Sequence, residues 1–115
     1  MNEKPNIVLD KTLAFSLEII KFCEELEQSR KFVIANQLLK SGTSIGANVY
    51  EAQHSESRAD FIHKIKIANK ETSETIYWLI LCESSESYPG IGDLKIKAEE
   101  ILKILSKIII TSKKV

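Results

Sequence analysis

Two acid–histidine pairs are the first candidates for a metal-binding or catalytic site: Glu51 with His54, and Asp60 with His63. In di-iron helical bundles, Glu-x-x-His motifs on two helices supply inward-pointing metal ligands. A rotation of about 100° per residue turns Glu51 and His63 away from the apolar faces of their expected helices. Both pairs also flank a turn instead of lying at mid-bundle. The pattern therefore predicts surface histidines, with no metal and no cofactor.

The sequence also lacks a motif for catalysis by a serine, threonine or cysteine nucleophile. The serines and threonines include no GxSxG elbow, and neither Cys23 nor Cys82 is followed by a suitably placed base. The stretch from Gly42 to Gly46 is no phosphate loop, since no lysine follows it and no strand precedes it. We therefore expect a protein that is not an enzyme. The isolated cysteines indicate buried thiols in a reducing compartment, which predicts a cytoplasmic location.

Composition narrows the class of protein. A chain of 115 residues predicts one domain over residues 1–115. Sixteen basic and sixteen acidic side chains give a formal net charge of +0, which argues against a generic polyanion-binding protein. Only four glycines and two prolines occur, which favours helices. The polar N-terminus predicts no signal peptide, and no apolar run is long enough to span a membrane.

Apolar residues spaced by three and four positions predict an all-α fold, an antiparallel up-down four-helix bundle. An arm over 1–9 precedes expected helices over 10–28, 31–55, 58–87 and 93–112. Asp10 is the expected N-cap of the first helix, and Ser57-x-x-Asp60 resembles a capping box for the third. Gly92 and Asp93 are expected to cap the fourth.

Each expected helix has a seam of residues that should form the core. The seam residues are Phe15, Ile19, Phe22 and Leu26; Phe32, Ala35, Leu39, Gly42, Gly46, Val49 and Gln53; Phe61, Ile65, Ala68, Thr72, Thr75, Leu79 and Cys82; and Leu94, Ala98, Ile101, Leu105 and Ile108. Gly42 and Gly46, next to Ala47, would permit close approach of two helices, and this would offset the cost of about 1 kcal/mol per glycine. The alternative is a kink over residues 41–44.

The apolar content exceeds what a lone bundle can cover. Residues 76–82 are apolar on every side of the third helix, and Ile104 and Ile110 lie outside the seam of the fourth. This predicts a homo-oligomer whose candidate interface residues are Tyr77, Trp78, Leu81 and Ile110. In the alternative, Trp78 wedges between the helices of one thick bundle.

Basic residues outside the seams form a candidate nucleic-acid-binding set. Its members are Arg58, His63, Lys66, Lys70, Lys103 and Lys107, with Lys113 and Lys114 further along the same helix. A ring of subunits could align them into one continuous surface. The alternative is an ordinary solvated face, supported by Glu99 four residues before Lys103.

Four stretches carry a family resemblance. They are QLLKSGTSIGANV over 37–49, SRADFI over 57–62, IANKET over 67–72 and ETIYWL over 74–79. The chain closely resembles the bacterial four-helix-bundle family encoded within intervening sequences of 23S ribosomal RNA genes. That family includes the accessory variability determinant proteins of diversity-generating retroelements.

The resemblance implies a protomer that assembles into a ring, commonly a homopentamer. For the retroelement members it also implies binding of nucleic acid and of a reverse transcriptase through a strongly basic surface, from which the zero net charge of this chain departs. The first hypothesis is therefore a non-enzymatic, ring-forming protein that associates weakly with RNA. The alternative is a protein–protein adaptor, such as a reverse-transcriptase accessory subunit without RNA contact.

Overall fold

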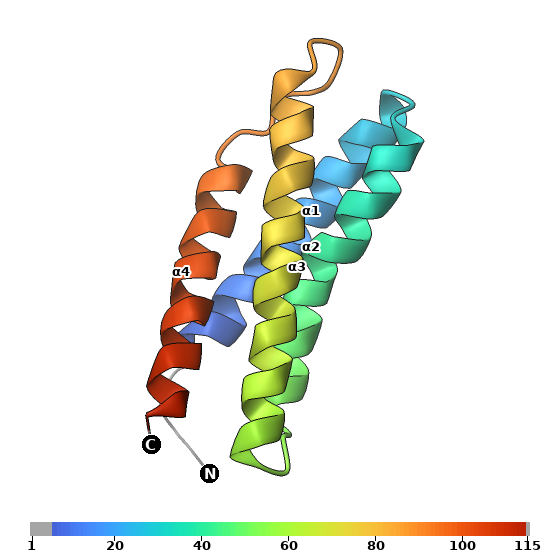
Figure 1. Cartoon of the computed structure of the whole chain (residues 1–115). Coiled ribbons are helices and arrows are strands. Elements are labelled where there is room, and N and C mark those ends of the chain that lie inside the picture. The colour runs from blue at the N-terminus through green and yellow to red at the C-terminus, as the bar shows by residue number, and fades with distance from the viewer. Residues whose placement is uncertain (1–5, 115) are drawn as a thin grey trace.

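The computed structural model describes residues 6–114, which form four α-helices and no strand. The helices are α1 (Ile7–Gln28), α2 (Phe32–Ala52), α3 (Arg58–Ser84) and α4 (Leu94–Lys113) (Figure 1). The predicted all-α class is confirmed. No helix among these residues is long and apolar enough to cross a membrane.

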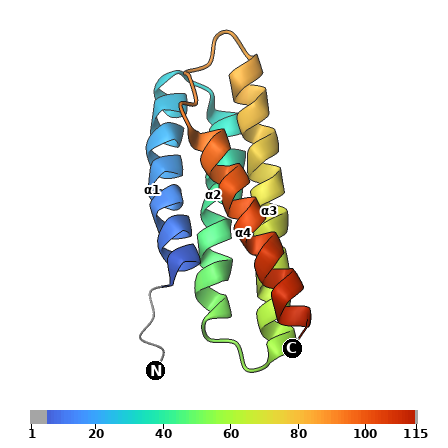
Figure 2. The same cartoon turned by 90° about the vertical axis from the view of Figure 1, so that its left-hand side faces the viewer.

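The four helices run alternately up and down, so that each packs against the next along the chain (Figure 1). The bundle closes where α4 meets α1, and this contact is the least extensive of the four. Figure 2 shows the reason, because α4 crosses the bundle obliquely and moves away from α1 toward its C-terminal end. The cyclic order places the outer face of α1 and α2 opposite the outer face of α3 and α4.

The start of α1 differs from its prediction. Asn6 is the N-cap, and its side-chain oxygen accepts a hydrogen bond of 3.1 Å from the backbone N–H of Leu9. The prediction of Asp10 as the cap is therefore wrong, and residues 7–9 of the predicted arm are helical. Asp10 lies in the first turn, where a carboxylate interacts favourably with the positive end of the helix dipole. Residues 1–5 of the predicted arm lie outside the described part of the chain.

The other helix ends follow from local hydrogen bonds. Ser57 caps α3 as predicted, because its hydroxyl accepts from the backbone N–H of Asp60 at 3.0 Å. Asp93 occupies the N-cap of α4 without a side-chain capping bond, and its carboxylate lies 3.5 Å from the ammonium group of Lys97. α2 and α3 end three residues before their predicted limits. After Ala52 the backbone forms a tighter turn, in which the N–H groups of residues 53–55 each donate a hydrogen bond to the carbonyl three residues earlier.

The core lies along the predicted seams of α1, α3 and α4, whereas the seam of α2 is rotated. Large side chains that are fully buried are Phe15, Ile19, Leu26, Leu38, Ile45, Ile65, Leu79 and Leu105. On α2, Leu38 and Ile45 are buried where Leu39 and Gly46 were expected, and Phe32 is 53% exposed. Gln53 is also exposed. α2 packs between α1 and α3 and must cover both neighbours, so its buried stripe turns toward α3.

α2 remains helical through residues 41–44, and Gly42 lies where α1 and α2 approach most closely. A Cβ atom at Gly42 would lie 2.8 Å from Cγ2 of Ile19, which is shorter than real contacts allow. A Cβ atom at Gly46 would lie 3.1 Å from Oγ of Ser16. Ala47 is exposed and takes no part in this approach. The close packing therefore rests on Gly42 and, less strictly, on Gly46.

Candidate interaction surfaces

Tyr77 and Trp78, two candidate interface residues, occupy different environments on α3. Trp78 is half-buried and packs against the core, and its indole N–H donates a hydrogen bond of 3.0 Å to the Glu74 carboxylate. Tyr77 is 54% exposed, and its ring meets the Trp78 ring edge-on at a centroid distance of 5.4 Å. The Tyr77 ring is thus exposed to a partner, whereas the Trp78 ring makes most of its contacts within the protomer.

The four candidate interface residues do not lie at one height. Asn69 of α3 donates a hydrogen bond of 3.1 Å to the Ser106 hydroxyl of α4, which fixes the register of the two helices. Tyr77 lies above this level and Ile110 below it, so they are about 18 Å apart along the bundle axis at 1.5 Å per residue. Leu81 is half-buried one turn beyond Tyr77. On α3 and α4, Ile80 and Ile96 are also exposed apolar residues, with exposures of 42% and 59%.

Sequence reasoning missed a second apolar surface. Leu13, Leu17 and Ile20 form a row on α1 with exposures of 60%, 62% and 40%. Beside them Ala47 and Tyr50 of α2 line a groove of about 340 Å³, together with Leu13 and the flanking residues of α1. These five residues are termed the α1–α2 apolar face. Their spacing of four and three on α1 was the available signal, but the neighbouring seam from Phe15 to Leu26 explained the helix without it.

Lysines gather on the outer face of α3 and α4. Lys66 and Lys70 of α3 and Lys103 and Lys113 of α4 are exposed there, and these four residues are termed the lysine track. The ammonium group of Lys113 lies beside that of Lys66 and lowers the pKa of Lys66, because a second positive charge disfavours protonation. The structure thus brings together three predicted residues and Lys113.

Three other lysines of the described bundle form ion pairs, whereas the lysines of the track, like Lys21 and Lys40, do not. Lys64 pairs with Glu51 at 2.9 Å, Lys95 with Glu83 at 2.7 Å and Lys97 with Glu18 at 2.9 Å. Within residues 6–114, no ion pair joins a lysine of the track to an acidic side chain. Its positive charges are therefore uncompensated at contact distance, although the chain as a whole is neutral.

The other predicted basic residues lie outside the track. Lys107 lies one turn after Lys103 on nearly the same side of α4, where it borders a depression of about 310 Å³ beside Ile104 and Ile108. Arg58 begins α3 and His63 is exposed one turn later, so both lie at the end of the bundle formed by the α2–α3 turn. Arg58 thus lies more than two turns before Lys66 on α3, whereas His63 lies one turn before it.

The acid–histidine pairs are engaged in surface contacts. The ring of His54 lies 5.5 Å from that of Tyr50, and Glu51 forms its ion pair with Lys64. Among the described residues, no group of three histidine, cysteine or acidic side chains is arranged to hold a metal ion. The pairs therefore act in the structure as packing and ion-pairing groups.

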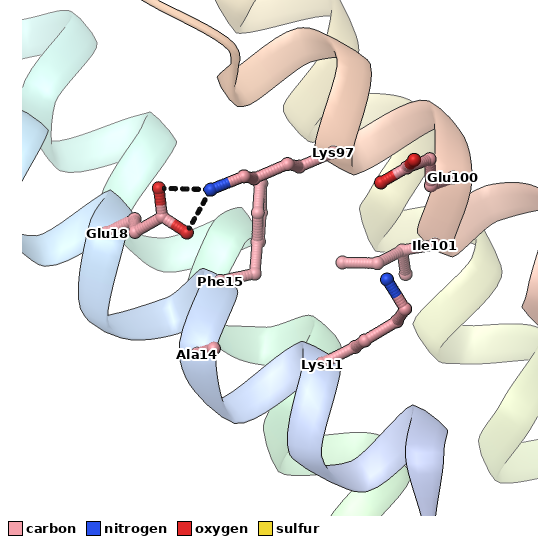
Figure 3. A pocket seen from close by; sticks show the side chains of 7 residues that line it. All are labelled: Lys11, Ala14, Phe15, Glu18, Lys97, Glu100 and Ile101. Atoms are coloured by element: carbon pink, nitrogen blue, oxygen red, sulfur yellow. Dashed lines mark hydrogen bonds and ion pairs between the residues drawn. The ribbon is translucent and has the colours of Figure 1, made fainter.

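A small pocket of about 150 Å³ lies between α1 and α4 (Figure 3). Glu18 accepts two hydrogen bonds of 2.9 Å from the Lys97 ammonium group, and this contact raises the pKa of Lys97. Figure 3 shows Lys11 and Glu100 at the opposite end, with Phe15 and Ile101 between the charged groups. Two lysines balance two glutamates, so the pocket has no preference for a ligand of one sign and serves to join α4 to α1.

Comparison with known proteins agrees with this architecture. A family model described as 23S rRNA-intervening sequence protein matches residues 4–107. A crystal structure of a protein with unknown function from the S23 ribosomal protein family of Bacteroides thetaiotaomicron VPI-5482 is 44% identical, with a TM-score of 0.84. The match covers 89% of this chain and 97% of that chain. No curated protein matches the sequence.

Proposed function

Because the chain belongs to the 23S rRNA-intervening sequence protein family, we propose that it is a non-enzymatic, self-assembling protein that associates with RNA in the cytoplasm. The observation that carries the RNA association is the lysine track, whose positive charges are not paired within the described bundle. Nucleic-acid affinity comes largely from lysine and arginine charges that neutralise phosphates. A neutral chain can supply this affinity when its positive charges are concentrated on one face.

The repulsion between Lys66 and Lys113 supports the same function. Two ammonium groups held side by side destabilise each other, and the lowered pKa of Lys66 reflects this. A phosphate placed between them would replace repulsion by two charge-assisted hydrogen bonds. A phosphate bound at this pair would therefore contact two positive charges that have no acidic partner within the described bundle.

RNA association is tested by the salt dependence of binding. Nuclease-treated protein is titrated with a structured fragment of ribosomal RNA at about 50 and about 200 mM salt, where each phosphate contact steepens the decline in affinity. We expect binding at the lower salt, a steep decline at the higher salt, and at least tenfold weaker binding by the K70E/K103E variant. The matched control K21E/K40E makes the same charge change on α1 and α2. No binding at low salt would overturn the RNA association.

Self-assembly into a ring, commonly a homopentamer in the family that the sequence resembles, is supported by apolar residues on two sides of the bundle. The α1–α2 apolar face lies on one side, and Tyr77, Ile80 and Ile96 are exposed on the other. Apolar patches that a monomer leaves uncovered mark interaction sites. Two unlike patches suit a head-to-tail contact, which generates a ring when the rotation closes.

Sedimentation velocity tests the assembly. We expect the wild-type chain to sediment at several times its mass of 13.0 kDa. The L17E and I80E variants should each sediment as smaller species while retaining their helical circular dichroism. V33E, at another exposed apolar position that is 74% exposed on α2, is the matched control. A monomeric wild type would overturn the proposal.

The alternative function is a protein–protein adaptor, such as a reverse-transcriptase accessory subunit, without RNA contact. The α1–α2 apolar face favours it, because Leu13 and Leu17 remain mostly exposed in the protomer. The two functions give different results in the experiments above. Absence of RNA binding, together with an L17E variant of unchanged oligomeric mass, would favour the adaptor and assign this face to a different protein.

A further inference from the structure

The lysine track also indicates which form of RNA it fits. We propose that the track binds the sugar-phosphate backbone of double-stranded RNA and does not read the bases of a single strand. This inference rests on the proposed RNA association and specifies its ligand class. It follows from the chemistry of the four side chains, from their spacing on two rigid helices, and from the residues that lie between them.

The chemistry of the track suits phosphates and does not suit base edges. All four residues are lysines, which donate from a compact point charge, whereas the planar fork of arginine matches the paired acceptors of guanine. Phosphate contacts position a protein on a duplex and carry no sequence information. The track therefore predicts binding that is insensitive to sequence.

The track spans two packed helices, with two lysines on each. Lys66 and Lys70 are one helical turn apart, about 6 Å along α3, and Lys103 and Lys113 span about 15 Å of α4. The bond from Asn69 to Ser106 fixes the two helices in register. Positive charges that project from two helices in fixed register suit the regular backbone of a duplex better than a flexible strand, which binds in grooves that follow its path.

Proteins that bind single strands stack the bases on aromatic side chains, and the track has none between its lysines. The exposed aromatic side chain nearest along α3 is Tyr77, about 10 Å beyond Lys70, and its ring already meets the edge of Trp78. Between the lysines lie Ser73 and Ser106, whose hydroxyl groups can exchange hydrogen bonds with ribose 2′-hydroxyls. Double-stranded RNA is recognised mainly through such 2′-hydroxyl and phosphate contacts.

The inference is tested with three labelled probes of equal length: an RNA hairpin with a perfect stem, an unstructured RNA strand, and a DNA duplex with the sequence of the stem. The full-length protein is titrated with each at low salt. We expect the hairpin to bind at least tenfold more tightly than the strand and more tightly than the DNA duplex. A hairpin with a permuted stem sequence should bind equally well.

The variants separate the track from general charge. K66Q/K113Q removes two exposed charges that lie outside the core, so it should fold as well as the wild type while binding the hairpin at least tenfold more weakly. K21Q/K40Q changes the charge equally on α1 and α2 and should retain affinity. Equal or tighter binding of the unstructured strand would overturn the duplex inference and leave the RNA association standing. Absence of binding to all three probes would overturn both. An equal loss in K21Q/K40Q would show that the track is not the site.

Discussion

The hydroxyl of Thr75 on α3 donates a hydrogen bond of 2.9 Å to the hydroxyl of Ser41 on α2, and both residues are buried. This polar contact lies within the seam that joins the two helices. It places Ser41 opposite Thr75 and so specifies the register of α2 against α3. Ser41 also faces the carbonyl of Leu38 at 3.5 Å, while Thr75 lies 2.8 Å from the carbonyl of Glu71.

The Thr75–Ser41 contact predicts an asymmetric mutant pair. Thr75→Val should destabilise the fold by about 1–2 kcal/mol, because Ser41 then retains only its long contact with Leu38. Ser41→Ala should cost less, since the Thr75 hydroxyl can then donate to the Glu71 carbonyl, 2.8 Å away. Urea unfolding at one fixed protein concentration measures both variants and their double mutant. A double-mutant effect equal to the sum of the single effects would show that the two hydroxyls do not interact.

Gly42 provides a test of the α1–α2 approach. Gly42→Ala gains about 1 kcal/mol of helix propensity but places a methyl group 2.8 Å from Cγ2 of Ile19. We expect a net destabilisation of about 1–3 kcal/mol from overpacking, measured by thermal unfolding. Gly46→Ala should cost less because its shortest contacts, 3.1 Å to the Ser16 hydroxyl and 3.2 Å to the Thr12 carbonyl, are longer than that at Gly42, whereas Gly46→Leu should be destabilising. Gly90→Ala, where no atom lies within 4 Å, is the control. A stabilised G42A variant would contradict the packing account.

Tyr77 and Trp78 should respond differently to truncation. Trp78→Ala removes a half-buried ring and its bond to Glu74, so it should lower the melting temperature strongly. Tyr77→Ala removes a mostly exposed ring and should lower the oligomeric mass with little change in the melting temperature of the dissociated chain. Sedimentation and circular dichroism on the same samples distinguish the two effects. If Trp78→Ala dissociates the assembly without a loss of stability, Trp78 belongs to the interface instead of the core.

The two buried thiols predict a loss of stability at alkaline pH. Burial, with smaller contributions from Cys82 and Glu27, raises the pKa of Cys23 from 9.0 to about 12, and burial raises that of Cys82 to about 11. The unfolded chain therefore loses thiol protons at lower pH than the folded chain. The stability linked to these thiols is complete below pH 9 and declines as pH rises toward 11 and 12.

The C23A/C82A variant tests this linkage. Its unfolding free energy should depend less on pH above pH 9 than that of the wild type, since the same lysines titrate in both proteins. Native protein at pH 8 should react slowly with a thiol reagent, and two thiols should react after denaturation. Rapid labelling of the native protein would contradict the burial of these groups, and fewer than two free thiols would contradict the proposed reducing compartment.

Much of the fold could be predicted from the sequence, because helix periodicity is local. Phe15, Ile19 and Leu26 recur at the interval of one helix face, and all three are buried. The Ser57 cap was equally readable, since its partner Asp60 is only three residues away. The start of α1 was not, because Asn6 and Asp10 are both acceptable caps and packing of the first turn decides between them.

The candidate surfaces were less predictable, because exposure depends on neighbouring helices. The row from Leu13 to Ile20 has the spacing of a buried stripe, yet the described protomer leaves it uncovered. Leu38 and Leu39 are adjacent in the sequence. Leu38 is the one that is fully buried, because α2 lies between α1 and α3.

The number of helices, most of their limits and the glycine at which two of them meet follow from local features of the sequence. These properties depend on backbone hydrogen bonds and side-chain periodicity within a few residues. Only the tertiary structure decided that Lys66 meets Lys113 and that Thr75 meets Ser41. Such pairs depend on the register between antiparallel helices, which is set by the packing of the whole core and by the lengths of the turns.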